Sequence, residues 1–206
     1  MYSVEILLAL WSFAFVSSAT PGPNNLMLMA SGMNYGFKKT IPHLFGIGLG
    51  FPAMIVLIGV GLMGVFSAIP YSFTVLRIVS ALYLLFLAWK IANASPLKDD
   101  HDQSASKPFT FIQAALFQWV NPKAWAMALT AISVYSTGAS PIIDVLVVAC
   151  SFMAVGMITM STWAILGVQL RRFFNDRKKQ RTFNIACAVL LVATLYPMLQ
   201  SLHPET

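Results

Sequence analysis

The sequence predicts an all-α integral membrane protein with six transmembrane helices, arranged as two inverted three-helix repeats whose first helices are broken. Three observations lead to this prediction: an apolar composition, six long apolar stretches, and a polar linker between the third and fourth stretches. Of the 206 residues, 58% are hydrophobic and only 10% are charged, whereas soluble domains carry about 25% charged residues. Most of the surface is therefore expected to face lipid.

Six apolar stretches are long enough to cross a bilayer, which takes roughly 20 residues of helix. They cover residues 4–35, 41–68, 73–94, 109–136, 142–170 and 183–202. The first stretch carries Glu5 and lacks the basic start of a cleavable signal peptide, so we expect it to be retained. As one straight helix it would extend about 48 Å, against a hydrocarbon core of about 30 Å. Tilt, a kink and a partly re-entrant segment each remain open.

The basic residues predict the orientation. Eleven of the 13 Lys and Arg residues lie in the connections after the first, third and fifth stretches. Because basic loops stay in the cytoplasm, both termini are predicted to lie on the non-cytoplasmic side of the membrane. This orientation accounts for the net charge of +6, and we expect no nucleic-acid partner. For the run RRFFNDRKKQR, contacts with anionic lipid are an alternative interpretation.

A polar linker, residues 95–107, divides the chain into a first half, residues 1–94, and a second half, residues 108–206. Each half has three apolar stretches. Because three is odd, the second half must enter the membrane from the opposite side, as in the inverted repeats of transporters. The leading stretch of each half also contains an interior interruption, SSATPGPNN in the first and FQWVNPKAW in the second.

These interruptions are the candidate site. A helix break in hydrocarbon leaves backbone groups without partners, so it persists only inside the protein or beside a polar cavity. Helices that restart at Pro23 and Pro122 would expose N–H groups at a positive dipole end, which attracts carboxylates. We expect the two restarts to meet near the membrane midplane. The predicted substrate-binding residues are Pro21, Gly22, Pro23, Asn24, Asn25, Gln118, Asn121, Pro122 and Lys123.

The charged residues considered for a functional role within the apolar stretches are Lys123, Arg77 and Asp144. Lys123 is about 21 Å along its stretch, where an ammonium facing lipid would cost several kcal/mol. We expect it to face the interior, either on the substrate or ion pathway or as a structural partner. Arg77 and Asp144 lie near outer ends, which favours interfacial placement, with an Arg77–Asp144 outer gate as the alternative. Asp144 is also the carboxylate best placed to carry a coupling proton.

Enzymatic and metal-binding motifs are absent from the sequence. No Gly-x-Ser-x-Gly or His-Glu-x-x-His pattern occurs, so we expect no catalytic residues, no cofactor and no enzymatic activity. The acidic run Asp99, Asp100, His101 and Asp102 is interpreted as a solvated loop, because four adjacent residues do not converge on one ion without a scaffold.

Several segments resemble the LysE/RhtB family of bacterial amino-acid exporters. SSATPGPNNLMLMASGMNYGFKKTIPHLFGIGLG is similar to the start of that family, ALYLLFLAWKI to its third-span motif, and FQWVNPKAW to its Asn-Pro-Lys motif. The resemblance implies proton-driven export of amino acids from the cytoplasm, through Pro21, Gly22, Pro23, Asn121, Pro122 and Lys123. The first motif is nearest to the branch that handles neutral substrates such as homoserine, threonine, cysteine or O-acetylserine.

An alternative function is export of metal cations, since related small transporters move cations. Few carboxylates or soft ligands occur in the apolar stretches, and helix N-termini repel cations, which weighs against this alternative. The expected partners are therefore a small amino-acid substrate, the lipid bilayer and a coupling proton. The substrate's identity and the formation of a homo-oligomer remain open.

Overall fold

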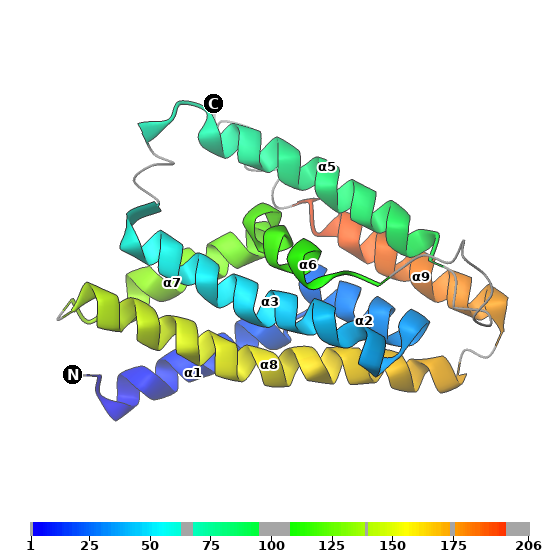
Figure 1. Cartoon of the computed structure of the whole chain (residues 1–206), viewed down its shortest axis with the longest axis horizontal. Coiled ribbons are helices and arrows are strands. Elements are labelled where there is room, and N and C mark those ends of the chain that lie inside the picture. Colours follow the sequence, from blue (N-terminus) through cyan, green and yellow to red (C-terminus); the bar gives the residue numbers. More distant parts are fainter. Residues whose placement is uncertain (1, 63–67, 95–107, 139, 174–175, 197–206) are drawn as a thin grey trace.

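The computed structural model describes residues 2–62, 68–94, 108–138, 140–173 and 176–196. These segments are helices joined by short turns and contain no strand, which confirms the all-α class (Figure 1). The elements are α1 (Val4–Ala19), α2 (Pro23–Tyr35), α3 (Phe37–Leu57), η1 (Ile58–Leu62), α5 (Ser72–Ala92), α6 (Phe111–Phe117), η2 (Gln118–Val120), α7 (Pro122–Tyr135), α8 (Pro141–Phe173) and α9 (Arg177–Ala193).

In the described segments, fewer than six helices have the length and hydropathy expected of a membrane span. Three do so alone: Phe37–Gly61, Thr74–Ala92 and Pro141–Phe173. The α1–α2 pair passes as a fourth if its two bent parts form one span. The predicted span 109–136 is divided into α6, η2 and α7. The predicted span 183–202 overlaps α9, and its residues 197–202 lie outside the described segments. The linker 95–107 and residues 63–67 of the second predicted span also lie outside them.

Both predicted helix breaks are present. The first helix bends by 55° between α1 and α2, so a kink accounts for the excess length of the first stretch. At the second break, α7 begins at Pro122, and the side chain of Asn121 accepts a hydrogen bond from the Lys123 N–H at 3.2 Å. Proline suits the first helical position because its missing N–H would have no helical partner there.

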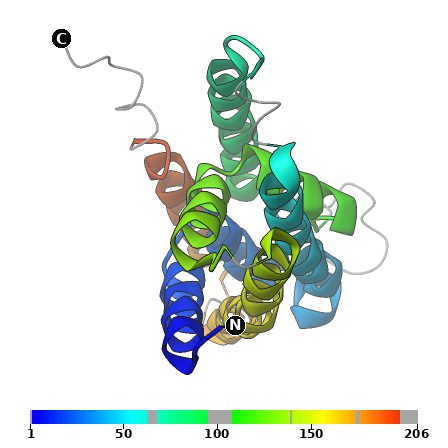
Figure 2. The same ribbon diagram turned by 90° about the vertical axis from the view of Figure 1, so that its left-hand side faces the viewer.

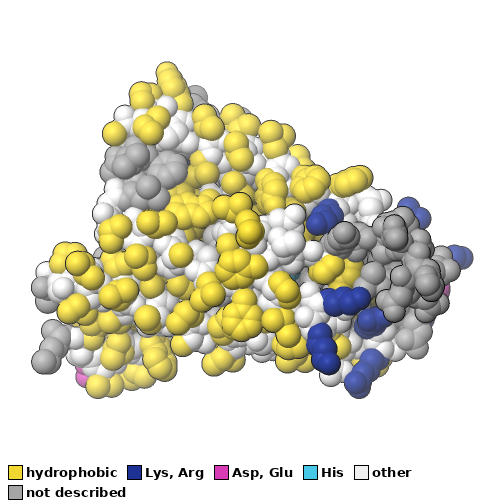
Figure 3. All heavy atoms as spheres, in the orientation of Figure 1, with side chains coloured by type: hydrophobic (Ala, Val, Ile, Leu, Met, Phe, Trp, Pro, Cys, Tyr) yellow, Lys and Arg dark blue, Asp and Glu magenta, His cyan; other side chains and the backbone are white. Residues whose placement is uncertain are grey.

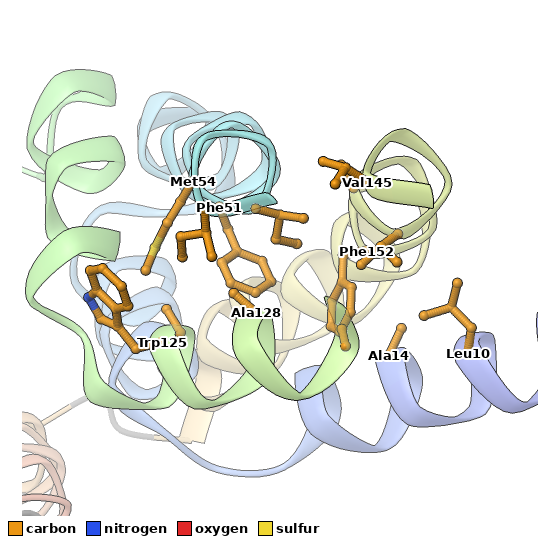
Figure 4. Packing of buried hydrophobic residues seen from close by; sticks show 14 residues of the cluster. Leu10, Ala14, Phe51, Met54, Trp125, Ala128, Val145 and Phe152 are labelled. Carbon is orange, nitrogen blue, oxygen red and sulfur yellow. The ribbon is translucent and has the colours of Figure 1, made fainter. Parts of the chain in front are cut away.

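An apolar core joins helices of both halves. Its buried residues come from α1, α3, α7 and α8, and Figure 4 shows Phe51, Phe152 and Ala128 converging at its centre. The Phe152 ring meets Phe51 edge to face, with centroids 5.3 Å apart, a preferred aromatic geometry. This core fixes the breaks of α1–α2 and α6–α7 relative to α3 and α8. A second core joins α2, α5 and α9, and α5 lies to one side of the other helices (Figure 2).

The polar and apolar surfaces are separated along the molecule. Lys and Arg side chains gather at one end, and hydrophobic side chains cover the flanks (Figure 3). We call this region the basic end. Its described residues are Lys38, Lys39, Lys90, Arg171, Arg172, Lys178, Lys179 and Arg181. Exposed apolar side chains such as Leu8 and Leu82 suit a lipid-facing flank.

Helices α2 and α8 approach closely through glycine. A β-carbon placed on Gly167 of α8 would collide with the carbonyl oxygen of Met29, and one on Gly32 of α2 would collide with the carbonyl oxygen of Ala164. Both glycines are buried. The two helices therefore interlock backbone to backbone, as small residues permit in membranes.

This close approach predicts that Gly167→Ala destabilises the protein. Alanine adds about 1 kcal/mol of helix propensity, but its methyl group must push two backbones apart, and such overpacking costs about 1–3 kcal/mol or more. Gly156→Ala on the same helix is the matched control, because its β-carbon would meet only the flexible Met160 methyl group at 3.3 Å. We expect thermal unfolding in detergent to begin roughly 4–8 °C lower for Gly167→Ala than for Gly156→Ala. Equal midpoints would contradict the interlocked packing.

Candidate functional site

The two helix breaks lie against each other. The side-chain amides of Asn24 and Gln118 exchange two hydrogen bonds, with Asn24 Nδ2 donating at 2.9 Å and Gln118 Nε2 donating at 3.2 Å. Lys123, one residue after Pro122, reaches across to Thr20. The structure thus brings together restarts that lie about a hundred residues apart in the chain, as expected from the sequence.

The carbonyl end of α1 is completely satisfied by side chains. The last four carbonyls of a helix have no partner within it, and an unpaired buried carbonyl is costly. Thr20 Oγ1 donates to the Ser17 carbonyl at 2.9 Å, Asn25 Nδ2 to the Ser18 carbonyl at 2.7 Å, and Trp163 Nε1 to the Ala19 carbonyl at 3.2 Å. The Thr20 carbonyl accepts from Asn25 Nδ2 and from Lys123 Nζ, each at 2.8 Å.

Lys123 is half-buried and faces the interior, as the sequence predicted. Its ammonium also donates to Thr20 Oγ1 at 2.8 Å and more weakly to the Pro21 carbonyl at 3.4 Å. A β-carbon on Gly22 would lie 2.8 Å from Lys123 Cδ, so a larger residue at position 22 would have to shift the Lys123 side chain from this position. The structural role that the sequence left open for Lys123 is therefore present.

The two restarting helices differ at their N-termini. In α7, Asn121 caps the Lys123 N–H with its side chain, and its carbonyl accepts from Ala124 and Trp125 at 3.0 and 3.2 Å. In α2, the N-cap residue is Gly22, and no side chain caps the helix. Its first backbone hydrogen bond runs from the Leu26 N–H to the Gly22 carbonyl at 3.0 Å. The α2 end is therefore the one with N–H groups available to a ligand.

A cavity of about 50 Å³ lies at the meeting point, several times the roughly 10–15 Å³ that one water needs. Six of the nine predicted binding residues line it: Gly22, Asn24, Asn25, Gln118, Asn121 and Lys123. The other three, Pro21, Pro23 and Pro122, start or flank the helices and are not among its lining residues.

One wall of this cavity was not predicted from the sequence. It is apolar and comes mainly from α3, α7 and α8, with Ile47, Phe51, Met127, Phe152 and Met160 among its residues. Ser17 and Ser18 of α1 also line the cavity. The apolar residues carry no recognisable signal in the sequence, because inward-facing positions of a helix look the same whether they line a core or a cavity.

Arg77 and Asp144 are placed away from the cavity, on α5 and in the first turn of α8. The Asp144 carboxylate is buried and accepts from Thr137 Oγ1 at 2.8 Å and from the Gly138 N–H at 2.9 Å. Both of its oxygens thus bind the turn between α7 and α8. The Arg77–Asp144 outer gate stays a prediction.

Metal-binding clusters are absent from the described part of the chain, where no three His, Cys, Asp or Glu side chains converge. The acidic run Asp99 to Asp102 lies outside that part. Among the described residues, those that line the cavity supply amides, hydroxyls, apolar groups and one ammonium, and no carboxylate.

Comparison with known proteins agrees with this arrangement. The family described as LysE type translocator matches residues 15–194. Cysteine/O-acetylserine efflux proteins of Escherichia coli (strain K12) and of Shigella flexneri are each 32% identical over 189 residues, which cover 91% of this chain and 94% of the relative. No solved structure matches the chain. The family match spans both helix breaks and the cavity between them, and the chain therefore belongs to the LysE type translocator family.

Proposed function

We propose that the protein exports small neutral amino acids, such as cysteine or O-acetylserine, from the cytoplasm and is driven by the proton gradient. The observation that carries this proposal is the cavity where the two helix breaks meet. It presents a helix C-terminus and a helix N-terminus next to each other, and these two ends complement the two charges of an amino acid.

The substrate carboxylate binds at the start of α2. This helix end has a positive dipole and no side-chain cap, and helix N-termini bind anions. Pro21 and Pro23 have no N–H, so the donors are those of Gly22, Asn24 and Asn25. Lys123 Nζ supplies a full positive charge beside Gly22. Discontinuous helices in other transporters use the same device for a substrate carboxylate.

The substrate ammonium binds on the α1 side of the cavity. A helix C-terminus carries a partial negative charge, and Ser17 and Ser18 of α1 line the cavity with hydroxyl groups. Asn24 and Gln118 also line the cavity, and each of their side-chain oxygens, which accepts one hydrogen bond from the other amide, has a second lone pair for a ligand. These acceptors are neutral, which suits a substrate without net charge. The absence of a carboxylate from the cavity lining weighs against export of metal cations and of basic amino acids.

The substrate side chain packs against the apolar wall. The cavity beside Phe51, Phe152 and Met160 has a volume of only about 50 Å³, which favours a short side chain over a long one. This fits the two relatives, which are named for efflux of cysteine and O-acetylserine. Methionine is flexible and fills irregular gaps, so Met127 and Met160 accommodate substrates that differ by a few atoms.

The transmembrane arrangement belongs to the same proposal. α6, η2 and α7 form a broken span equivalent to α1 and α2, and α9 is the start of a sixth span, which gives two inverted three-helix repeats. The basic end faces the cytoplasm, where Lys38, Arg171 and Lys179 meet the headgroups. Both termini then lie on the non-cytoplasmic side of the inner membrane.

Everted membrane vesicles test the transport function. In everted vesicles the cytoplasmic face of the protein is outward, so export runs into the vesicle. With the vesicle interior acidic, we expect them to accumulate labelled O-acetylserine and cysteine. A protonophore should abolish accumulation while leaving downhill exchange intact. Absence of both accumulation and exchange would contradict amino-acid export.

The same vesicles control the orientation. A cysteine in place of Lys179 should react with an impermeant thiol reagent in everted vesicles and be protected in intact cells. The reverse labelling pattern would show that the basic end faces outward.

Lys123→Met tests the carboxylate site, because it keeps much of the side-chain length and removes the charge. Truncating one partner of a buried charge pair costs about 2–5 kcal/mol. We therefore expect binding of free amino acids to weaken well over tenfold, and binding of their uncharged amide analogues to change far less. The measurement is the affinity of both ligand classes for the purified variant.

The control is Lys39→Met, the same substitution at an exposed lysine of the basic end. It should leave both affinities at their wild-type values. Thermal stability must be measured in parallel, because Lys123 also donates to the Thr20 carbonyl. A stable Lys123→Met protein that binds acids and amides in the wild-type ratio would rule out the carboxylate contact.

A further inference from the structure

His43 of α3 is a buried polar side chain without an evident structural role. It is 0% exposed, and neither ring nitrogen has a hydrogen-bond partner in the described part of the chain. A neutral imidazole has one donor and one acceptor nitrogen, and leaving such a group buried without a partner costs about 1–3 kcal/mol. Buried groups of this kind are rare in native proteins and call for a functional explanation.

A hydrogen bond one turn away on α3 and a ring contact describe the surroundings of His43. Thr40, almost one helical turn earlier on α3, shares a hydrogen bond of 2.9 Å with Ser31 of α2. The Phe109 ring packs against the imidazole at a centroid distance of 5.1 Å. A cavity of about 20 Å³ is lined by Phe109, Ser31 and Lys90, which is room for one water. Phe109 is thus both a neighbour of the imidazole and part of the lining of this cavity.

The position of His43 links the substrate cavity to the basic end. Ile47 lies four residues further along α3 and lines the substrate cavity, and residues four apart share a helix face. In the opposite direction, α3 starts with Lys38 and Lys39 at the basic end. His43 therefore lies between the proposed amino-acid site and the surface that carries the cytoplasmic charges.

The charged groups around His43 are cationic. Lys90 of α5 contacts the same Phe109 ring that packs against His43, with Nζ 4.4 Å from the ring centroid. α2 contributes Tyr35 as its titratable residue and α6 contributes none, while α8 brings Arg171 and Arg172 at this end and Asp144 at the other. A proton on His43 would be repelled by Lys90 in this arrangement. The conformation in the structure is accordingly one that holds a neutral imidazole.

We propose that His43 carries the coupling proton of the exporter. This inference rests on the proposed function. An imidazole nitrogen takes up one proton from the outer side while the cavity is open outward, which forms an imidazolium. The proton leaves to the cytoplasm when the protein returns to the arrangement seen here, where Lys90 opposes the charge. No other atom is transferred. The carboxylate of Asp144, which the sequence suggested as the proton carrier, instead accepts hydrogen bonds from the turn between α7 and α8.

His43→Gln tests this inference in proteoliposomes. Glutamine keeps one donor and one acceptor group but does not titrate. We expect downhill exchange of labelled O-acetylserine within about twofold of wild type, because the amino-acid site is unchanged. Accumulation driven by a pH gradient should fall to the level that wild type shows with a protonophore. Thr40→Val is the matched control at a buried neighbour that cannot titrate, and it should change exchange and accumulation in the same proportion.

The outcomes separate this inference from the proposed function. If wild type does not exchange amino acids, the proposed function fails. If wild type exchanges and accumulates but a folded His43→Gln protein retains both activities, or loses both equally, His43 does not carry the proton. If wild type exchanges without responding to a pH gradient, this inference also falls.

A second variant covers the case in which His43→Gln does not fold. The chain has three histidines, so His101→Gln with His203→Gln leaves His43 as the sole imidazole. Nitrogen-15 spectra of this variant, recorded from pH 5 to 9 with and without O-acetylserine, report the protonation of that ring. We expect the ring to gain a proton within this range in at least one of the two conditions. A ring that stays neutral throughout both titrations would overturn the inference.

Discussion

The structure depends on how the carbonyl end of α1 is satisfied inside an apolar protein. A helix that stops in the middle of a membrane leaves four carbonyl groups without helical partners, and lipid offers none. Here these carbonyls accept from Thr20, Asn25, Trp163 and Lys123. The donors come from α1 itself, from α2, from α8 and from α7. The break therefore holds both halves of the chain together.

These same bonds link the break to the proposed function. Asn25 and Lys123 both donate to the Thr20 carbonyl, so a carboxylate that attracts the Lys123 ammonium leaves this carbonyl to Asn25 alone. Binding in the cavity and the bend between α1 and α2 are then energetically coupled, since a ligand shifts a conformational equilibrium by its differential affinity for the two states. A substrate site at a bent helix can in this way be connected to movement of that helix.

Sequence predicted the parts of this arrangement that follow from local chemistry. Asn121 and Pro122 fix the start of α7. The charge of Lys123 predicted an interior position for its side chain. The bonding partners of Lys123 depend on packing between distant segments, and so does the apolar wall formed by Phe51 and Phe152. The Arg77–Asp144 gate also depends on packing between distant segments and stays a prediction, whereas the hydrogen bonds of the Asp144 carboxylate come from a local turn whose geometry the sequence does not reveal.

The central claim is that the two breaks meet around the substrate. It is tested most directly by a cross-link between Asn24→Cys and Gln118→Cys, whose native side chains are hydrogen-bonded at 2.9 Å. Cys150 and Cys187 are replaced by alanine, a protease site is added within residues 95–107, and a short bifunctional thiol reagent is applied. We predict that the cleaved halves stay joined and that O-acetylserine slows the cross-linking of the two cysteines. A control pair, Asn24→Cys with Leu116→Cys, has its second thiol on the exposed face of α6. Cross-linking no faster than in this control, or unaffected by substrate, would contradict the account.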